Sequence, residues 1–264
     1  MSETNNIYLI NGEFNNDKKN FIKRLSGSVK NIKDMGFAGY DNRRDLEKNL
    51  EWQVFDEGVI DKNFSFNEGK IKELIEETLN KCLKEINRKP HIFVFPSYNK
   101  FTNEKMGGVG GNSSKYLVML IFINTSIKKW EKNLKETVCH EFAHAISPYY
   151  NPWKNTIGEG IIFDGIAENF QEYVLKGRKS TFSNILAEDE CRRIFVEITE
   201  KLSSKNQEEY NELFYGGGKY KHWTGYALGY WLVKKYLKTL EKVNWESIIN
   251  TNPNEMLSEI KKIL

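Results

Sequence analysis

The chain of 264 residues is 39% hydrophobic, 13% aromatic and 28% charged, a composition that is typical of globular proteins and argues against intrinsic disorder. Its 39 Lys and Arg residues are interspersed with 36 Asp and Glu residues, and the net charge of +3 offers no case for a nucleic-acid partner. The 3 cysteines show no CxxC spacing, which argues against a disulfide framework and against a cysteine zinc cluster.

The sequence predicts neither a targeting segment nor a membrane span. Residues 1–6 lack the basic and apolar regions of a signal peptide, so we expect a cytoplasmic protein. The longest apolar run, residues 116–123, is far shorter than the roughly 20 residues that cross a bilayer. We therefore expect no insertion into a membrane.

Residues 1–90 predict an N-terminal, mostly helical lobe. It begins with a short strand at residues 7–10 and a weakly marked helix within residues 21–35. Two amphipathic helices follow at residues 43–55 and 67–87, where apolar side chains recur at three- and four-residue spacing.

Residues 91–264 are predicted to carry the chemistry, in one continuous structure with the N-terminal lobe. Residues 91–95 are β-branched and aromatic and predict a strand that ends at Pro96. Residues 106–112 contain 4 glycines and predict a flexible flap or turn. Residues 116–124 predict a second strand, which could pair with an extended peptide.

A helix capped by Thr125 or Ser126 is predicted next, and it contains the letters HEFAH at residues 140–144, an HExxH motif. Because residues four apart lie on the same face of an α-helix, His140 and His144 can present two imidazole nitrogens to one zinc ion. Glu141 lies about 100° round the helix from His140. There it can take a proton from a metal-bound water without being a ligand itself.

The following helix has well-marked ends. It opens with a capping-box pattern from Thr156 to Glu159 and closes at Gly177. Gly160 and Gly165 lower its helix propensity, which suggests a close approach to another backbone. We expect that neighbour to be the helix that carries the two His.

A catalytic zinc usually has three protein ligands and one open position, so the two His need a partner. The candidates on this helix are Glu159, Asp164 and Glu168, and helix periodicity alone does not choose among them. Glu159 is best explained by its capping role, whereas Asp164 and Glu168 share a face.

The C-terminal part is predicted to be helical, with helices at residues 187–202, 223–240 and 255–264. Gly216-Gly217-Gly218 and Asn252-Pro253 mark the breaks between them.

HExxH followed by an acid on the next helix resembles the gluzincins, thermolysin-like metallopeptidases whose zinc ligands are two His and a Glu. Asp164, 20 residues after His144, matches the position of their third ligand. Residues 163–170, FDGIAENF, resemble the E/D-G-L-A-E-x-F segment of a bacterial family of predicted zinc-dependent proteases of unknown physiological role. This resemblance extends over residues 91–240 and includes the segment GYALGY at 225–230.

The resemblance implies a mainly helical, zincin-like α+β fold with a small mixed β-sheet beside the HExxH helix. It also implies one Zn²⁺ per chain, bound by His140, His144 and Asp164. Asp164 is one methylene shorter than the usual Glu, so its helix must lie closer to the metal. Gly160 and Gly165 would permit that approach.

Three further residues receive roles from the resemblance. Glu168 would hold the first His of the motif through the outer nitrogen of its ring. Tyr226 or His222 would stabilise the negative charge that develops on the substrate oxygen during hydrolysis.

The predicted function is therefore a zinc-dependent metallopeptidase that hydrolyses a peptide or protein substrate by a zinc-activated water, with Glu141 as general base. The alternative is a non-catalytic, zinc-stabilised binding or regulatory protein in which the metal only holds the fold. Glu141 favours the enzyme, because a purely structural site has no use for a base at that position.

Overall fold

The computed structural model describes residues 6–31, 35–55, 63–114, 117–151 and 155–264. The prediction that the chain has no signal peptide rests mainly on residues 1–5, and the predicted second strand begins at Tyr116. These residues lie outside the described residues.

The chain divides into two compact units, Met1–Ala145 and Ile146–Leu264. Among the described residues, the strands all belong to the first unit and the second unit is built from helices. The predicted α+β class is thereby confirmed. The predicted lobe of residues 1–90 lies wholly within the first unit, and that it forms a lobe of its own stays a prediction.

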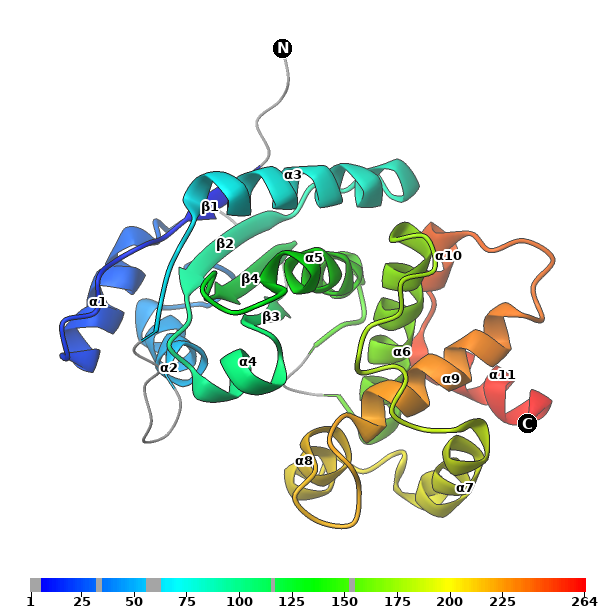
Figure 1. The fold of residues 1–264 in the computed structure, drawn as a ribbon. Coiled ribbons are helices and arrows are strands. Elements are labelled where there is room, and N and C mark those ends of the chain that lie inside the picture. Colours follow the sequence, from blue (N-terminus) through cyan, green and yellow to red (C-terminus); the bar gives the residue numbers. More distant parts are fainter. Residues whose placement is uncertain (1–5, 32–34, 56–62, 115–116, 152–154) are drawn as a thin grey trace. The chain divides into compact units, whose positions relative to one another are not determined.

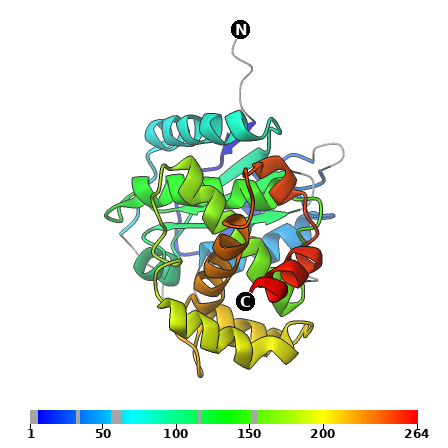
Figure 2. The same ribbon diagram turned by 90° about the vertical axis from the view of Figure 1, so that its right-hand side faces the viewer.

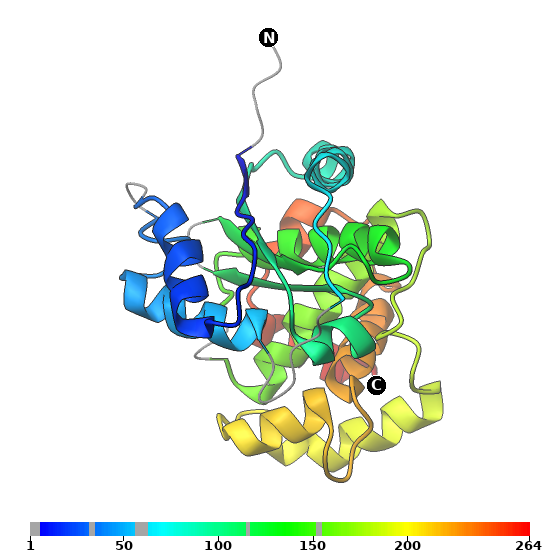
Figure 3. The same ribbon diagram turned by 60° about the vertical axis from the view of Figure 1, so that its left-hand side comes forward.

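The first unit is organised around a four-stranded sheet with the strand order β1-β2-β4-β3 (Figures 1 and 3). The strands are β1 (Ile7–Leu9), β2 (His91–Pro96), β3 (Val109–Ser114) and β4 (Val118–Ile123). β1, β2 and β4 run parallel to one another, whereas β3 is antiparallel to β4, so the sheet is mixed as predicted.

Two predictions about this sheet are wrong. β4 is paired on both sides, with β2 and with β3, so its backbone is not available to an extended peptide. The glycines of residues 106–112 predicted a flap or turn, but residues 109–114 form the edge strand β3. The sequence VGGNSS has little intrinsic strand preference, and the strand forms because β4 offers its backbone groups along the whole length of β3.

Helices cover both faces of the sheet. On one face, α1 (Lys18–Ser28) and α2 (Arg43–Val54) share a core with apolar side chains of β2 and β4. α4 (Lys100–Lys105) lies on that face as well, because Thr102 is the nearest neighbour of Gly110. The other face carries α3 (Glu68–Glu85) and α5 (Trp130–Ile146), as Figure 1 shows.

The helix with the HExxH motif, α5, begins later than predicted. Its first residue is Trp130, and neither Thr125 nor Ser126 caps it. Thr125 Oγ1 instead accepts a hydrogen bond from the N–H of Asn67, and Ser126 Oγ donates to the carbonyl oxygen of Asn63. Both hydroxyls serve the segment that leads into α3, a use that only the tertiary structure reveals.

The second unit consists of helices around the pair α6 (Ile157–Val174) and α9 (Thr224–Leu237), which Figure 2 shows together with their neighbours. The neighbours are α7 (Glu188–Ile198) with the 3₁₀ turn η1 (Thr199–Lys201), α8 (Gln207–Tyr215), α10 (Trp245–Ile249) and α11 (Pro253–Ile263). The predicted helices at 187–202, 223–240 and 255–264 are confirmed, whereas α4, α8 and α10 were not predicted.

The capping box at the start of α6 is confirmed. The N–H of Thr156 donates to Glu159 Oε2 at 2.8 Å, and the N–H of Glu159 donates to Thr156 Oγ1 at 3.2 Å. This explains Glu159 as a structural residue.

The two glycines of α6 do not serve the helix that was expected. A Cβ atom at Gly165 would lie 2.3 Å from the carbonyl oxygen of Gly229 on α9, and one at Gly160 would lie 2.7 Å from the ring of Tyr210 on α8. Their nearest neighbours therefore belong to α9 and α8 rather than to α5. The glycines are needed for packing within the second unit.

No helix in the described part of the chain combines the length and the apolar character that crossing a membrane requires.

Candidate metal centre

His140 and His144 project from α5, and the opposite side of that helix anchors it. Leu134, Val138 and Phe142 on that opposite side are fully buried and fix the rotation of α5 about its axis. The two imidazole rings then meet, with their Nε2 atoms 3.0 Å apart. Two nitrogens bound to one tetrahedral zinc at 2.0–2.1 Å lie roughly 3.3 Å apart, so the pair has nearly the separation that the metal requires.

Asp164 lies in the middle of α6 and is 7% exposed. Within the second unit, Tyr210 and Tyr226 lie close enough to Asp164 for its charge to act on their phenols. Burial raises the pKa of both phenols well above the ordinary value, and the charge of Asp164 adds to the increase in each. Both phenols are therefore protonated and can act as hydrogen-bond donors at neutral pH.

Among the described residues, the candidate metal ligands are His140 and His144 on α5 of the first unit and Asp164 on α6 of the second unit. Two imidazoles and one carboxylate are the donor set of a catalytic zinc that keeps a position for water. Two of the three side chains are buried, which favours binding of a partly dehydrated ion. The donor set thus fits the metal.

Glu141 follows His140 on α5 but is not a member of this group. Its side chain is 6% exposed, and its Oε2 accepts a hydrogen bond from Ser113 Oγ at 2.7 Å. The same hydroxyl lies 2.8 Å from the backbone carbonyl oxygen of Glu141. Ser113 belongs to β3, so the edge strand of the sheet holds this carboxylate.

Glu168, one turn after Asp164 on α6, is 2% exposed. Its Oε2 accepts a short hydrogen bond from Ser180 Oγ. The same oxygen of Ser180 accepts hydrogen bonds from the N–H groups of Phe182 and Ser183, so the carboxylate is tied to the turn after α6. That Glu168 holds an imidazole stays a prediction.

The two residues predicted to stabilise the oxyanion have different surroundings. Tyr226 lies in α9, where its ring contacts the rings of Phe214 and Trp223. The charge of Asp164 acts on its phenol. His222 is exposed and precedes α9.

His91, the remaining histidine, serves the sheet. Its Nδ1 lies 3.1 Å from the hydroxyl of Tyr8, with which it stacks, and its Nε2 lies 3.2 Å from the amide nitrogen of Asn6. Burial lowers the pKa of its imidazole. His91 is the first residue of β2, and its ring joins that strand to β1 through Tyr8.

Sequence reasoning missed Ser113, Gly111 and Tyr210. No motif marks Ser113 or Gly111, and only the pairing of β3 with β4 turns both toward α5. Tyr210 lies on α8, which was not predicted.

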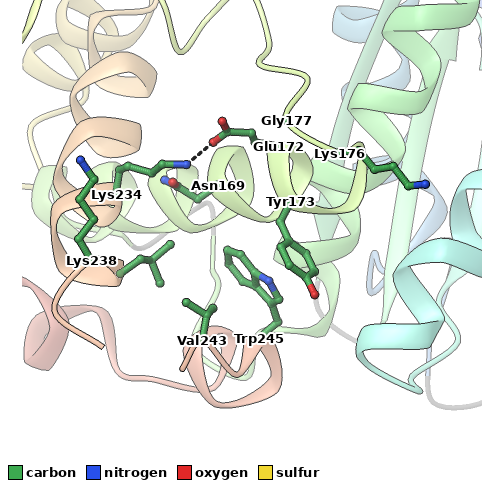
Figure 4. Close-up of a pocket in the computed structure, with 10 residues that line it drawn as sticks. Asn169, Glu172, Tyr173, Lys176, Gly177, Lys234, Lys238, Val243 and Trp245 are labelled. Atoms are coloured by element: carbon green, nitrogen blue, oxygen red, sulfur yellow. Dashed lines mark hydrogen bonds and ion pairs between the residues drawn. The ribbon is translucent and has the colours of Figure 1, made fainter. Parts of the chain in front are cut away.

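The second unit also has a pocket of about 460 Å³ near the C-terminal ends of α6 and α9 (Figure 4). Lys176, Lys234 and Lys238 line it, and Lys234 Nζ lies 2.6 Å from Glu172 Oε2. Positive charge at the C-terminal ends of two helices offsets the negative ends of their dipoles. The three candidate metal ligands are not among the residues that line this pocket.

Comparison with known proteins places the chain in a family. No curated protein and no solved structure matches it. A family model with the description "Predicted Zn-dependent protease (DUF2268)" matches residues 71–258, which is well over half of the chain and includes α5 and α6. The chain therefore belongs to this family of predicted zinc-dependent proteases.

Proposed function

We propose that this protein is a zinc-dependent metallopeptidase in which His140, His144 and Asp164 hold the metal and Glu141 is the general base. The observation that carries the proposal is the pair of imidazoles on α5, whose Nε2 atoms lie 3.0 Å apart, together with the carboxylate of Asp164 as a third donor and Glu141 next to His140 but outside the donor set. Membership of the protease family supports the same activity.

Zinc, when bound, lowers the pKa of a coordinated water and polarises a substrate carbonyl. The protein supplies the proton transfer. Glu141 takes a proton at its carboxylate and can later pass it to the amine of the departing peptide, as a positioned general base does. Burial of Glu141 keeps bulk water from competing for that proton.

The edge of β3 supports an extended peptide as substrate. The N–H of Asn124 donates to the carbonyl oxygen of Gly108, and hydrogen-bonded pairs alternate along an antiparallel ladder. The N–H and C=O groups of Gly111 and Ser113 therefore point away from β4. Within the described sheet no strand pairs with this side of β3, so its backbone can bind a peptide by strand addition.

For the charge that develops on the substrate oxygen we propose Tyr226, with His222 as the other candidate. A phenol near Asp164 supports Tyr226, because a donor is most effective where the charge develops. In the same proposal the fold is zincin-like and of the gluzincin kind, and Glu168 orients an imidazole ligand.

The alternative is a non-catalytic protein whose fold the metal stabilises. Within the described residues, Glu141 Oε1 has no hydrogen-bond partner, whereas Oε2 is held by Ser113. Glu141 lies outside the ligand group, and a purely structural metal site has no use for a base next to one of its ligands. This observation favours the enzyme.

The test is zinc analysis of the purified protein together with cleavage of a peptide library, with and without a chelator. We expect about one zinc per chain and cleavage that the chelator abolishes and added zinc restores. Absence of zinc after incubation with micromolar zinc would overturn the metal site. Zinc binding without cleavage of any peptide would favour the alternative.

A further inference from the structure

The contact between β3 and Glu141 lies wholly within the first unit. Ser113 is 2% exposed, and its hydroxyl touches the side chain and the main chain of the same residue, at 2.7 Å from Oε2 and 2.8 Å from the carbonyl oxygen of Glu141. A hydroxyl has a single proton, and a carboxylate is the stronger acceptor. Ser113 therefore donates to Oε2 when Glu141 is ionised.

Gly111 provides the space for the same side chain. A Cβ atom at Gly111 would lie 2.7 Å from Cγ and 3.0 Å from Oε1 of Glu141, and also 2.7 Å from Cγ2 of Thr137. These distances are too short for any side chain, so only glycine at this position lets the carboxylate occupy its place. Residues 111 and 113 are two apart on a strand and thus face the same helix.

The two contacts leave the oxygens of Glu141 unequal. Oε2 is held by Ser113, whereas Oε1 borders the space at Gly111 and has no hydrogen-bond partner in the described part of the chain. Ser113 and Gly111 together therefore define where the carboxylate of Glu141 lies.

We infer that Ser113 is the positioning residue of the general base and that Gly111 provides the space in which the side chain of Glu141 lies. The inference rests on the proposed function and adds residues that the HExxH motif does not contain. One edge strand then has two tasks, since its side-chain face holds the base and its outer backbone can bind the peptide.

The first experiment removes the hydroxyl. Ser113→Ala should lower kcat about 10- to 100-fold, because a carboxylate that is no longer held lies away from the position at which it takes the proton, with KM within about twofold of the parent and zinc content unchanged. Ser113→Thr, which restores a hydroxyl, should recover most of kcat. Ser114→Ala removes a hydroxyl from the opposite face of the same strand and is the matched control, with kcat close to that of the parent.

The second experiment fills the space and uses two adjacent glycines of β3. Gly111→Ala should lower kcat by at least as much as Ser113→Ala, because the new methyl displaces the carboxylate. Gly110→Ala should be tolerated, since a Cβ atom there would lie 3.5 Å from Thr102, an ordinary contact. This pair keeps the inference testable if Ser113→Ala folds poorly.

Crystal structures of the zinc-loaded parent and of Ser113→Ala report the carboxylate directly and need no substrate. The parent should show Ser113 Oγ bonded to Oε2, and the variant should show the carboxylate displaced or divided between positions. Parental kcat in both Ser113→Ala and Gly111→Ala, or an unmoved carboxylate in Ser113→Ala, would overturn the inference. Failure of the parent to cleave any peptide would instead count against the proposed function. The crystal structures would still show whether Ser113 holds the carboxylate of Glu141 in place.

Discussion

Gly165 on α6 and Gly229 on α9 face each other backbone to backbone, so that a Cβ atom on Gly165 would lie 2.3 Å from the carbonyl oxygen of Gly229. The contact sets the distance between the two central helices of the second unit. Asp164 is next to Gly165, so the same contact fixes the position of the candidate third ligand within this unit.

Gly229→Ala should destabilise the protein. A Cβ atom there would lie 2.1 Å from the carbonyl oxygen of Ile161, so the helices must separate, at a cost of about 1–3 kcal/mol or more in the free energy of unfolding. Gly69→Ala on α3 is the control, because nothing lies within 4 Å of the added methyl and helix propensity alone should raise stability by up to ~1 kcal/mol. Urea denaturation measures both. Equal stability of Gly229→Ala and the parent would contradict the close approach.

Glu141→Gln should lower turnover by about 10²-fold or more, because the amide keeps the shape of the side chain but accepts no proton. Zinc content should be unchanged, since Glu141 is outside the ligand group. Glu131→Gln, an exposed substitution in the first turn of the same helix, should leave turnover at the parental level. Parental turnover in Glu141→Gln would show that another group is the base.

Asp164→Ala should release zinc more readily than Glu168→Ala. Loss of Asp164 leaves the zinc with two protein ligands, whereas loss of Glu168 removes an outer contact and should cost about 10- to 100-fold in metal affinity or activity. Glu159→Ala is the control and should keep zinc, because Glu159 serves the capping box. Competition with a chelator gives the order, and the reverse order would make Glu168 the third ligand.

Glu77 gives α3 a pH-dependent link to α5. Hydrogen bonds from Lys135 on α5 and from Lys81 on α3 lower the pKa of its carboxyl to about 2. A carboxyl whose pKa is lower in the folded than in the unfolded state stabilises the protein at pH values above the unfolded-state pKa. This contribution to the free energy of unfolding is lost as the pH falls toward the folded-state pKa of about 2. Glu77 is exposed and Lys135 is half-buried, so water screens the pair and its contribution is at most about 1 kcal/mol.

Lys135→Met should therefore raise the pKa of Glu77 toward its ordinary value and shift acid unfolding only slightly to higher pH. NMR titration of the Glu77 carboxyl measures the first effect and circular dichroism the second. An unchanged titration would show that the Lys135 contact does not persist in solution.

Sequence patterns predicted the features that depend on local order along the chain. The four-residue spacing of His140 and His144 places both on one helix face whatever surrounds that helix. The capping box of Thr156 and Glu159 marked the start of α6 in the same way, because its hydrogen bonds join residues three apart. Membership of a zinc-protease family was also expected from short segments, and the family match confirms it.

Patterns failed where a long-range contact decides a local conformation. Gly110 and Gly111 suggested a flap, yet the backbone of β4 makes them part of a strand. Gly165 correctly signalled the close approach of another backbone, that of α9, whereas the nearest neighbour of Gly160 is the ring of Tyr210 on α8. A glycine does not specify its neighbour.

The HExxH helix, its two imidazoles and its acid thus follow from consecutive residues, because helix periodicity is a local property of the chain. The contact that holds the acid depends on the fold. Ser113 and Glu141 are 28 positions apart, and their contact exists because β3 adds to the edge of the sheet in the register that turns Ser113 toward α5. A shift of one residue in that register would turn the hydroxyl to the other face, and no local pattern in VGGNSS encodes the choice.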